Sequence, residues 1–537
     1  MTTHKNYIRR LIFVLLVGPI CLFHWRILFL GQLPDGGDML NQFIPWREFA
    51  LSCLSAGYLP LWNPYVFCGV PFWANIQTAL LFPWNVLHLV LNAPEFFAFS
   101  IVIHHLIAAI GMYLFFLNRR FGRVPALIAG TVYAWSGFFI LHSNDGHLIH
   151  IQAYAYIPFC LLAQDRLRAG FSWLRVTGLA VPLAMMIFAG HLQLPLYTFY
   201  LLLFRALWPQ NSGFSFKTVG RDLIRTGTGI AASLLICAAV ILPLLQFSGY
   251  SSTRAGGAEY EFATHDSMPP AHLLTLFAPF FYGDPTYEAP DRKFWETITG
   301  YHEICGYAGV VSIVLAFFAF VPLPESHPHG DMGVAPGAVS EGQGEGSQPA
   351  STSMQRIGGR DEMNSQPPPN LPRSSGEGKD GAPGEEEAWG EEEAWGEEEA
   401  SGEEEERASR QDREGAWGKE KEGGSLDRSL PQRLGETQRG LNRPAGYTIS
   451  PNENDFVTER RFALCLLIVA LLLALGHYTP LYRIPYHLFP GFAYFRVPGR
   501  LVLFYGLAVS ILAGLGTLRL CRAGWWQVRQ HPAVAAL

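Results

Sequence analysis

The chain has 537 residues, of which 49% are hydrophobic and only 16% are charged. Soluble globular proteins carry about 25% charged residues, so the composition excludes an ordinary soluble domain and predicts a multi-pass membrane protein. The formal net charge is −6, and no basic patch indicates a nucleic-acid partner.

Ten apolar segments come near the ~20 residues that a membrane-spanning helix needs. We expect these helices at residues 11–31, 96–118, 124–142, 148–164, 173–189, 192–208, 226–247, 304–322, 461–477 and 499–518. Basic residues in short loops mark the cytoplasmic side of a membrane, so Lys5, Arg9 and Arg10 place the N-terminus in the cytoplasm. The sequence therefore predicts an all-α transmembrane helical bundle of about ten spans in the inner or plasma membrane.

The first two of these helices are joined by a long loop, residues 32–95, which this topology places outside the cytoplasm. The loop contains one further apolar run, Ile76–Leu91, which is short and interrupted by Pro83. Counting this run as a span would move the basic sequence RRFGR that follows the second helix to the outer side. We therefore expect an interfacial or re-entrant segment that is protected by neighbouring protein.

Residues 323–460 separate an N-terminal membrane block, residues 1–322, from a C-terminal block, residues 461–537. This middle part contains an imperfect acidic repeat, EEEAWGEEEAWGEEEASGEEEE, surrounded by Pro, Gly and Ser. Such a segment cannot bury enough apolar surface to offset the entropy that ordering would cost. We expect a disordered cytoplasmic insertion that serves as a solvated spacer, with Trp389 and Trp395 as the only hint of a docking role.

Two aspartates follow the first predicted span in the sequence LPDGGDMLNQFIPW. Asp and Gly are common in turns, so turn formation and solubility are one explanation for Asp35 and Asp38. A carboxylate at the end of a span is only partly hydrated, which suits a catalytic general base. Gln42 follows Asp38 at helical spacing and is a candidate substrate contact.

Aromatic residues dominate the next part of the outer loop, from Leu59 to Trp84. Trp and Tyr gather at membrane interfaces, so an anchoring belt explains them without a ligand. The alternative is a surface on which sugar rings or a lipid chain stack. In that case Trp62 provides a stacking face, and Asn63 and Gln77 provide directional hydrogen bonds.

Further polar residues lie at the predicted outer ends of later helices. Asp145, His147 and His150 belong to the sequence HSNDGHLIH, and His191 and Gln193 belong to AGHLQ. A single interfacial histidine is usually a structural hydrogen-bonding group. Several of them in one layer, together with carboxylates, could orient a substrate or bind a divalent cation, although no HExxH-like ligand spacing supports a metal.

Arg496 and Arg500 flank a Pro-Gly turn before the last predicted span. They suit either phospholipid headgroups or the phosphate of a substrate. The sequence contains no P-loop, Rossmann fingerprint or nucleophile elbow, and nucleotides are not supplied outside the cytoplasm. An enzyme on this face needs a membrane-delivered donor, and a polyprenyl-phosphate sugar fits because phosphate leaves readily once its charge is stabilised.

Several motifs resemble those of the bacterial YfhO-type membrane proteins, which are placed among the GT-C glycosyltransferases. They include GDMLNQFIPW, GYLPLWNPYVFCGVPFWANIQTALLFPWN, AGHLQLPLYT and FRVPGRLVLFYGLAVSILAGLG, in the order of the family. The resemblance covers nearly all of the chain except the acidic insertion. It implies a GT-C bundle that moves a sugar from a polyprenyl-phosphate carrier to an envelope glycopolymer or lipid, with Asp38 as the catalytic acid of the first outer loop and Asp35 as its substitute.

Two other functions stay open at this stage. A flippase or transporter of lipid-linked saccharides predicts ionisable residues deep inside spans, whereas the conspicuous ones here gather at helix ends. A non-catalytic membrane scaffold predicts that the acidic insertion is essential and that Asp38 is not. The C-terminal block is also shorter than in relatives of this family, which is expected of a divergent short form or a truncated chain.

Overall fold

The computed structural model describes residues 2–34, 36–208, 215–250, 257–283, 300–322 and 453–523. This part of the chain is mostly helical, as the sequence predicts. Helices from both sides of the acidic insertion belong to one compact unit, so the two predicted membrane blocks pack together. The insertion itself lies outside the described residues up to position 452, and its last predicted residues belong to a helix that begins at Glu453.

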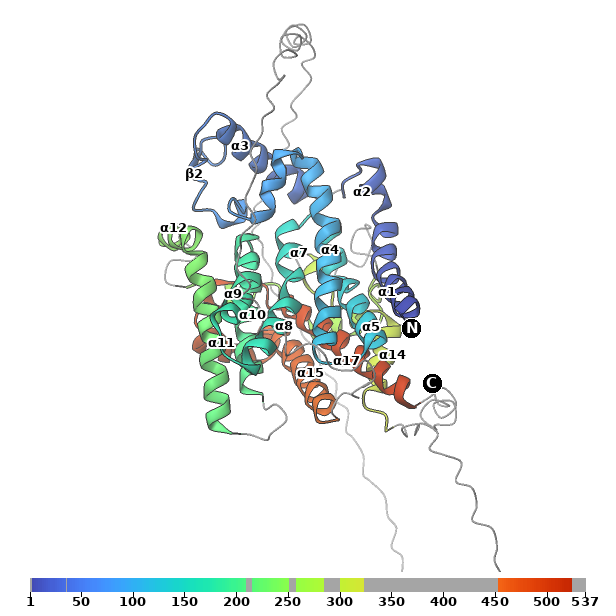
Figure 1. The fold of residues 1–537 in the computed structure, drawn as a ribbon. Helices are drawn as coiled ribbons and strands as arrows, with labels where there is room; N and C mark the ends of the chain where they lie inside the picture. The colour runs from blue at the N-terminus through green and yellow to red at the C-terminus, as the bar shows by residue number, and fades with distance from the viewer. Residues whose placement is uncertain are drawn as a thin grey trace, which may run out of the picture. The chain divides into compact units, whose positions relative to one another are not determined.

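Helices build most of this unit (Figure 1). In chain order they are α1 (Thr2–Phe23), α2 (Trp25–Leu30), α3 (Ile44–Ser55), α4 (Ala93–Asn118), α5 (Arg123–Ala134), α6 (Gly137–Asn144), α7 (Leu148–Ala155), α8 (Ile157–Ala169), α9 (Trp173–Phe188), α10 (Gln193–Leu207), α11 (Phe216–Ile236), α12 (Ala238–Ser248), α13 (Tyr260–Ala263), α14 (Val310–Phe318), α15 (Glu453–Ala474), α16 (Arg483–Leu488) and α17 (Val502–Ala523). Shorter helical turns are η1 (Met39–Phe43), η2 (Ile76–Thr78), η3 (Pro83–Leu89), η4 (Pro270–Leu276), η6 (Tyr301–Glu303), η7 (Gly476–Tyr478), η8 (Pro480–Tyr482), η9 (Phe492–Tyr494) and η10 (Pro498–Leu501). An antiparallel hairpin pairs β1 (Trp62–Asn63) with β2 (Val70–Pro71).

Each of the ten predicted spans contains helix, but few of these helices can cross a membrane alone. Among the described residues, Ala93–Asn118 and Pro498–Ala523 are long and apolar enough, and two bent pairs, α5 with α6 and α11 with α12, raise the number to four. The nine residues of α14 extend only ~13 Å, less than half of the ~30 Å hydrocarbon layer. The structure therefore supports two to four candidate spans where the sequence predicts about ten.

The sharpest bend separates α11 from α12, whose axes differ by 78°. Within α12, Pro243 has no N–H group, so the carbonyl oxygen of Ala239, four residues earlier, loses its usual helical partner. The indole N–H of Trp73 donates to this oxygen at 3.2 Å. Trp73, an aromatic residue of the predicted outer loop, thus completes the hydrogen bonding of the proline-containing helix α12.

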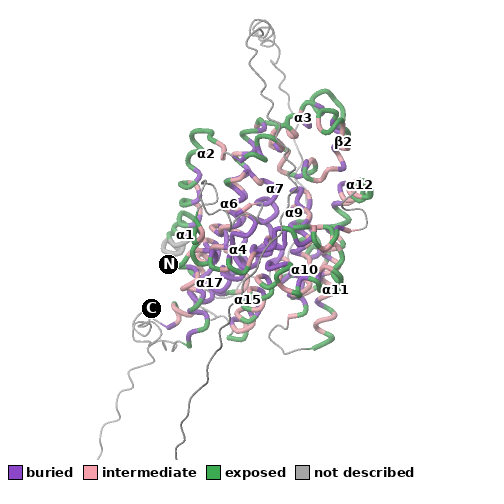
Figure 2. The backbone as a smooth tube through the Cα atoms, turned by 180° about the vertical axis from the view of Figure 1, so that it is seen from behind, coloured by how far each residue is buried: buried purple, intermediate pink, exposed green. Residues whose placement is uncertain are grey.

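The core of the unit is organised around α17, whose membrane-length segment is fully covered by other parts of the protein. It packs against α5, α14 and α15, and its glycines permit this close approach. A Cβ atom on Gly516 would lie 1.8 Å from the carbonyl oxygen of Leu315 in α14. Buried residues gather around α4 and α7, whereas α2 and α3 are largely exposed (Figure 2).

A buried ion network joins the C-terminal part of the chain to the N-terminal part. Arg205 of α10 pairs with Asp165 of α8 and, at 2.6 Å, with Glu459 of α15. Arg119, at the end of α4, also bonds Glu459 at 2.5 Å. The side chains of Asp165, Arg205 and Glu459 are at most 5% exposed, so opposite charge replaces the water that they lose on folding.

The predicted outer loop folds against one end of the helices. Its elements α3 and β2 lie at this end, and α15 lies at the other end (Figure 1). The run Ile76–Leu91 forms the short 3-10 helices η2 and η3, which confirms that it is not a spanning helix. The indole N–H of Trp84 donates to the hydroxyl of Tyr156 at 2.9 Å, and Arg47 donates to the carbonyl oxygen of Thr78 at 3.0 Å. The first bond anchors the run on the helices beyond the loop, and the second joins it to α3 within the loop.

Candidate functional site

A cluster of histidines, carboxylates and one arginine lies where five parts of the chain meet. These parts are the start of η1, the α6–α7 turn, the α9–α10 turn, η6 and η10. Gln193 at the first position of α10 belongs to this cluster, whereas Arg205 in the last turn of α10 belongs to the ion network. Twelve residues of helix separate the two by ~18 Å, so the cluster and the network lie at opposite ends of the unit.

The α6–α7 turn brings three histidines together. Gly146 adopts a φ of +72°, which glycine tolerates far better than other residues, and the chain folds back so that the N–H of His147 bonds the carbonyl oxygen of His142 at 2.9 Å. His150 follows in the first turn of α7. The ring of His142 lies 5.3 Å from that of His147 and 4.7 Å from that of His150, measured between centroids.

The outer loop delivers Asp38 to this turn. A Cβ atom on Gly36 would lie 2.4–2.6 Å from backbone atoms of Asp145 and Gly146, so only glycine allows the loop to come this close. Asp38 then lies with its Oδ2 atom 3.2 Å from Nε2 of His147. The Asp38 side chain is 58% exposed, which leaves it open to a substrate.

The short helix η10 closes the cluster on its other side. Arg500 forms a two-pronged ion pair with Glu303, with its Nε atom 2.5 Å from the carboxylate. The third guanidinium nitrogen, Nη1, donates to the side-chain oxygen of Gln193 at 2.6 Å and lies 3.4 Å from Nε2 of His191. Because all three guanidinium nitrogens have protein partners, Arg500 is a structural counter-charge in this arrangement.

A second acidic pair lies beside these groups. Nδ1 of His302 is 2.5 Å from Oδ2 of Asp145. Burial raises the pKa of Asp145, but the hydrogen bond and charge of His302 outweigh burial, so the pKa is lowered overall. In the same way burial raises the pKa of Glu303, and the charge of Arg500 overcomes this effect and lowers the pKa well below its usual value. Both carboxylates are therefore ionised near neutral pH.

The histidines respond to burial in the opposite sense. Burial, followed by the neighbouring His142 and His302 rings, lowers the pKa of His147 to about 3. Burial and the charge of Arg500 lower the pKa of His191 well below its ordinary value. Both imidazoles are neutral near pH 7 and each offers one nitrogen lone pair.

The structure brings together seven of the residues that the sequence singles out: Asp38, Asp145, His147, His150, His191, Gln193 and Arg500. The side chains of five others form no hydrogen bond or ion pair with the cluster in the described part of the chain: Gln42, Trp62, Asn63, Gln77 and Arg496. One more, Asp35, lies outside the described residues. The cluster therefore combines residues from four of the predicted polar motifs.

Several of the residues outside the cluster have evident structural roles. Asn63 is buried and its side-chain oxygen accepts the N–H of Tyr65 at 2.9 Å, which fixes the hairpin. Trp62 is half exposed and its indole covers Gly69, where a Cβ atom would lie 2.5 Å away. Arg496 contributes its backbone carbonyl oxygen, which accepts from Gln193 at 2.7 Å, and its side chain is exposed.

Sequence reasoning did not single out three members of the cluster as site residues: His142, His302 and Glu303. The signal for the last two is the sequence YHE directly before the apolar run 304–322. An acidic residue at such a boundary needs a counter-charge. The sequence does not show which basic residue provides it, because Arg500 lies 197 positions away from Glu303.

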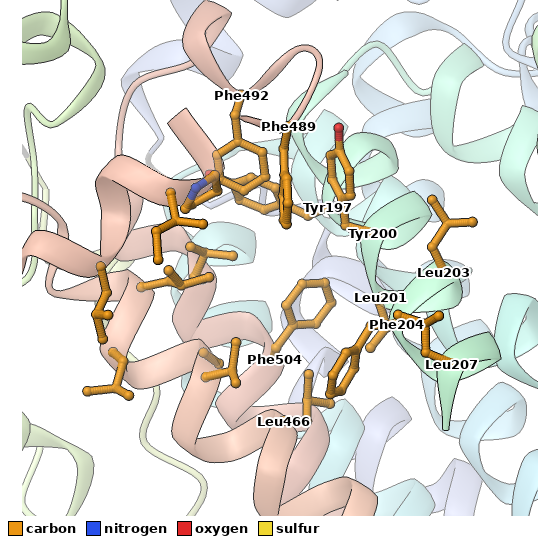
Figure 3. Close-up of a pocket in the computed structure, with 18 residues that line it drawn as sticks. Tyr197, Tyr200, Leu201, Leu203, Phe204, Leu207, Leu466, Phe489, Phe492 and Phe504 are labelled. Carbon is orange, nitrogen blue, oxygen red and sulfur yellow. The ribbon is translucent and has the colours of Figure 1, made fainter. Parts of the chain in front are cut away.

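An apolar groove of about 410 Å³ opens near the cluster. It is lined by α10, α15, α16 and the start of α17. Figure 3 shows Tyr197, Tyr200, Phe489 and Phe492 close together at one end of this groove. The hydroxyl of Tyr197 accepts a hydrogen bond from Gln193 at 2.7 Å, which links the groove to the polar cluster.

Within the described residues, two sets of side chains have the composition and proximity of metal ligands. His142, His147 and His150 form one set, and Asp145, His147 and His302 form the other, with one potential ligand atom of each residue within 4.8 Å of the others. In the second set Asp145 and His302 already bond each other. The first set consists of nitrogen donors alone.

Comparison with known proteins adds no assignment to these observations. No family model, no curated protein and no solved structure matches the chain.

Proposed function

We propose that this chain is an integral-membrane glycosyltransferase of the GT-C type that uses a polyprenyl-phosphate sugar as donor. The proposal rests on the sequence resemblance and on one geometric observation, the Asp38–His147 pair. Within the proposal the chain is multi-pass, with a cytoplasmic N-terminus and about ten segments in or across the membrane. The acceptor is a glycopolymer or lipid of the cell envelope.

Asp38 differs from the other carboxylates of the cluster in its surroundings. Glu303 pairs with Arg500 and Asp145 with His302, and the side chain of Glu303 is only 8% exposed. Asp38 is 58% exposed and is held by a single contact with His147. A carboxylate that is oriented from one side and open on the other is suited to receive a proton from a bound hydroxyl group.

The reaction then balances as a direct displacement. Asp38 accepts the proton of an acceptor hydroxyl group, and the hydroxyl oxygen forms the new bond to the anomeric carbon of the sugar. The bond between that carbon and the phosphate oxygen breaks, and its electron pair leaves with the polyprenyl phosphate. His147 orients the carboxylate, as a hydrogen-bonded neighbour does in other acid–base pairs.

Donor binding divides between a polar and an apolar part of the site. Arg500 is occupied by Glu303, so in this proposal the exposed Arg496 contacts the phosphate and Arg500 holds the cluster in place. The groove beside Tyr197 and Phe492 accepts the first isoprenoid units, because it is apolar and adjoins Gln193. The exposed Trp62 lies on the outer loop and is the candidate for stacking on a sugar ring.

The test is a transfer assay in reconstituted liposomes. Radiolabelled polyprenyl-phosphate sugars of several kinds are supplied with envelope acceptors, and product formation is compared between the wild type, Asp38→Asn and Glu261→Gln. Glu261 is an exposed carboxylate and serves as the matched control. We expect Asp38→Asn to reduce the rate by about 10²–10⁴-fold, the range for loss of a general base, and Glu261→Gln to retain it.

Two results would contradict the proposal. Equal rates for wild type and Asp38→Asn would show that Asp38 is not the general base. If the wild type transfers no sugar from any donor, with folding confirmed by circular dichroism, the proposal that the protein is a transferase is wrong. The scaffold alternative predicts this second result together with loss of cellular function when residues 323–452 are deleted.

One observation favours transport of lipid-linked saccharides as a second candidate. His104 and His105 lie in the middle of α4, a candidate span, and both are fully buried. His105 bonds His24, the residue between α1 and α2, at 2.9 Å, and His104 bonds the carbonyl oxygen of Ser100 at 2.8 Å. Ionisable residues inside a span often line a transport path. Movement of a labelled lipid-linked sugar between leaflets that survives Asp38→Asn and fails with His105→Phe would support this function over transfer.

A further inference from the structure

The three histidines of the α6–α7 turn contain an unusual number of unsatisfied nitrogen atoms. Neither ring nitrogen of His150 has a hydrogen-bond partner among the described residues, nor do Nδ1 of His147 and Nε2 of His142. The side chain of His142 is fully buried, and His150 as a whole is 7% exposed. Buried polar atoms are normally satisfied, so four such atoms in one turn point to a ligand.

The hydrogen bonds that do exist leave lone pairs directed into the cluster. Nδ1 of His142 lies 2.9 Å from the carbonyl oxygen of Phe138. A carbonyl only accepts, so Nδ1 carries the proton and Nε2 carries the lone pair. This lone pair faces the Glu303 carboxylate at 3.6 Å. Two acceptors that face each other are stabilised by a cation near them.

His147 has the arrangement in which a carboxylate supports a metal-binding imidazole. Its Nε2 atom lies 3.2 Å from Asp38, which leaves Nδ1 as the free nitrogen. Metal-binding histidines commonly donate their other N–H to a carboxylate, which fixes the tautomer and the ring orientation. His191 is different, because both of its nitrogens are near protein groups, the N–H of Leu194 and the guanidinium of Arg500.

The cluster also contains more carboxylates than guanidinium groups. Asp38, Asp145 and Glu303 contribute three negative charges, and Arg500 is the single guanidinium that pairs with them within the cluster. Arg500 pairs with Glu303, whereas Asp38 and Asp145 contact histidine rings of the cluster. Two carboxylates beside the three histidines favour a cation at this place by Coulomb attraction.

We propose that His142, His147 and His150 bind one divalent transition-metal ion, and that zinc is the best match. Three imidazole nitrogens suit zinc, whereas calcium and magnesium prefer oxygen ligands. Ligands ~2.0–2.1 Å from a tetrahedral ion lie ~3.4 Å apart, and one ring nitrogen of each of the three histidines lies within 4.8 Å of the others. Side-chain movements on the order of 1 Å therefore close the site around an ion.

The position of this ion defines its role. It would draw the α6–α7 turn together and hold His147, and through His147 it would orient Asp38. A three-histidine zinc site retains a fourth coordination position, which either Glu303 or an oxygen of a phosphate-containing ligand can occupy. The metal site does not depend on the proposed transferase function, because the same nitrogens are present whichever activity the protein has.

The experiment measures zinc directly on the full-length protein in detergent micelles. The protein is stripped with a chelator and dialysed against buffered zinc chloride, and bound metal is determined by mass spectrometry. We expect about one zinc per chain for the wild type and loss of this zinc in His142→Gln and His150→Gln. His88→Gln is the matched control, since His88 also has one bonded and one unsatisfied ring nitrogen but lies outside both ligand sets.

Two further readouts separate metal binding from misfolding. The visible spectrum of the cobalt-substituted wild type should show the intense bands of tetrahedral coordination, which requires no variant. Asp38→Asn should bind zinc about 10–100-fold more weakly, the usual effect of removing a carboxylate behind a ligand histidine. A wild type that binds no zinc, or a folded His150→Gln that binds as much as the wild type, overturns the proposal. If a proton on His142 takes the place of the metal, the wild type will bind no zinc.

Discussion

The buried ion network allows a quantitative test of how the two ends of the chain are joined. Glu459 of α15 is the acceptor for both Arg205 of α10 and Arg119 at the end of α4, and its side chain is 2% exposed. In Glu459→Ala the two arginines keep only Asp165 as acidic partner within this network. Removing one member of a buried ion pair costs about 3–5 kcal/mol, because the remaining charge stays desolvated.

The same helix provides a matched control. Glu453, also in α15, pairs with Arg522 of α17 at 2.9 Å, but its side chain is 57% exposed. An exposed pair contributes about 0–1 kcal/mol, so Glu453→Ala should have a small effect. Both changes are Glu to Ala in one helix, which leaves burial of the ion pair as the main difference between them.

The assay is equilibrium unfolding in mixed micelles, followed by circular dichroism. We expect Glu459→Ala to lower the free energy of unfolding by about 3–5 kcal/mol and Glu453→Ala by less than about 1 kcal/mol. Equal losses for the two variants would refute the reasoning. That result would mean that water reaches Glu459, or that α15 does not pack on α10 in the folded protein.

Three further predictions concern glycines and the acidic insertion. Gly36→Ala should lower sugar transfer by up to about 10²-fold, because the added Cβ atom displaces the outer loop from the α6–α7 turn. Gly37→Ala is the control and should not lower it, since the nearest atom to its Cβ position is 3.9 Å away. Equal activities of the two variants would contradict the proposed fit. Gly516→Ala should cost about 1–3 kcal/mol through overpacking against α14, whereas Gly178→Ala, with open space around its Cβ position, should stabilise α9 by up to about 1 kcal/mol, as unfolding in micelles would measure. Deletion of residues 323–452 should leave the unfolding midpoint of the helical unit unchanged, and a lowered midpoint would show that the insertion supports the fold.

The apolar segments were accessible from the sequence because hydrophobicity and helix formation are local properties. All ten segments contain helix, and the interruption of Ile76–Leu91 by Pro83 correctly excluded a spanning helix. The number of spans was not accessible. A run such as 304–322 reads as a span by composition, yet only Val310–Phe318 is helical, because the preceding residues turn to bring Glu303 into the cluster.

The candidate site was partly visible in the same way. Asp38, His147, His191 and Arg500 occur in polar motifs at predicted helix ends, and this gave the expectation that they share one face. Their partners were not visible, since the counter-charge of each buried group is chosen by packing and not by sequence distance. Arg500 illustrates the difference, because the sequence offers its guanidinium to a phosphate and the tertiary structure commits it to Glu303.

The sequence by itself therefore determined the helical character of this protein and the residue types that its polar end can use. Local apolar runs, prolines and glycines carry that information within a few residues. Only the tertiary structure decided which histidines keep free nitrogens and which carboxylates are neutralised. These outcomes follow from the desolvation of groups that come from five separate parts of the chain, and each buried charge is stable only with the partner that packing supplies.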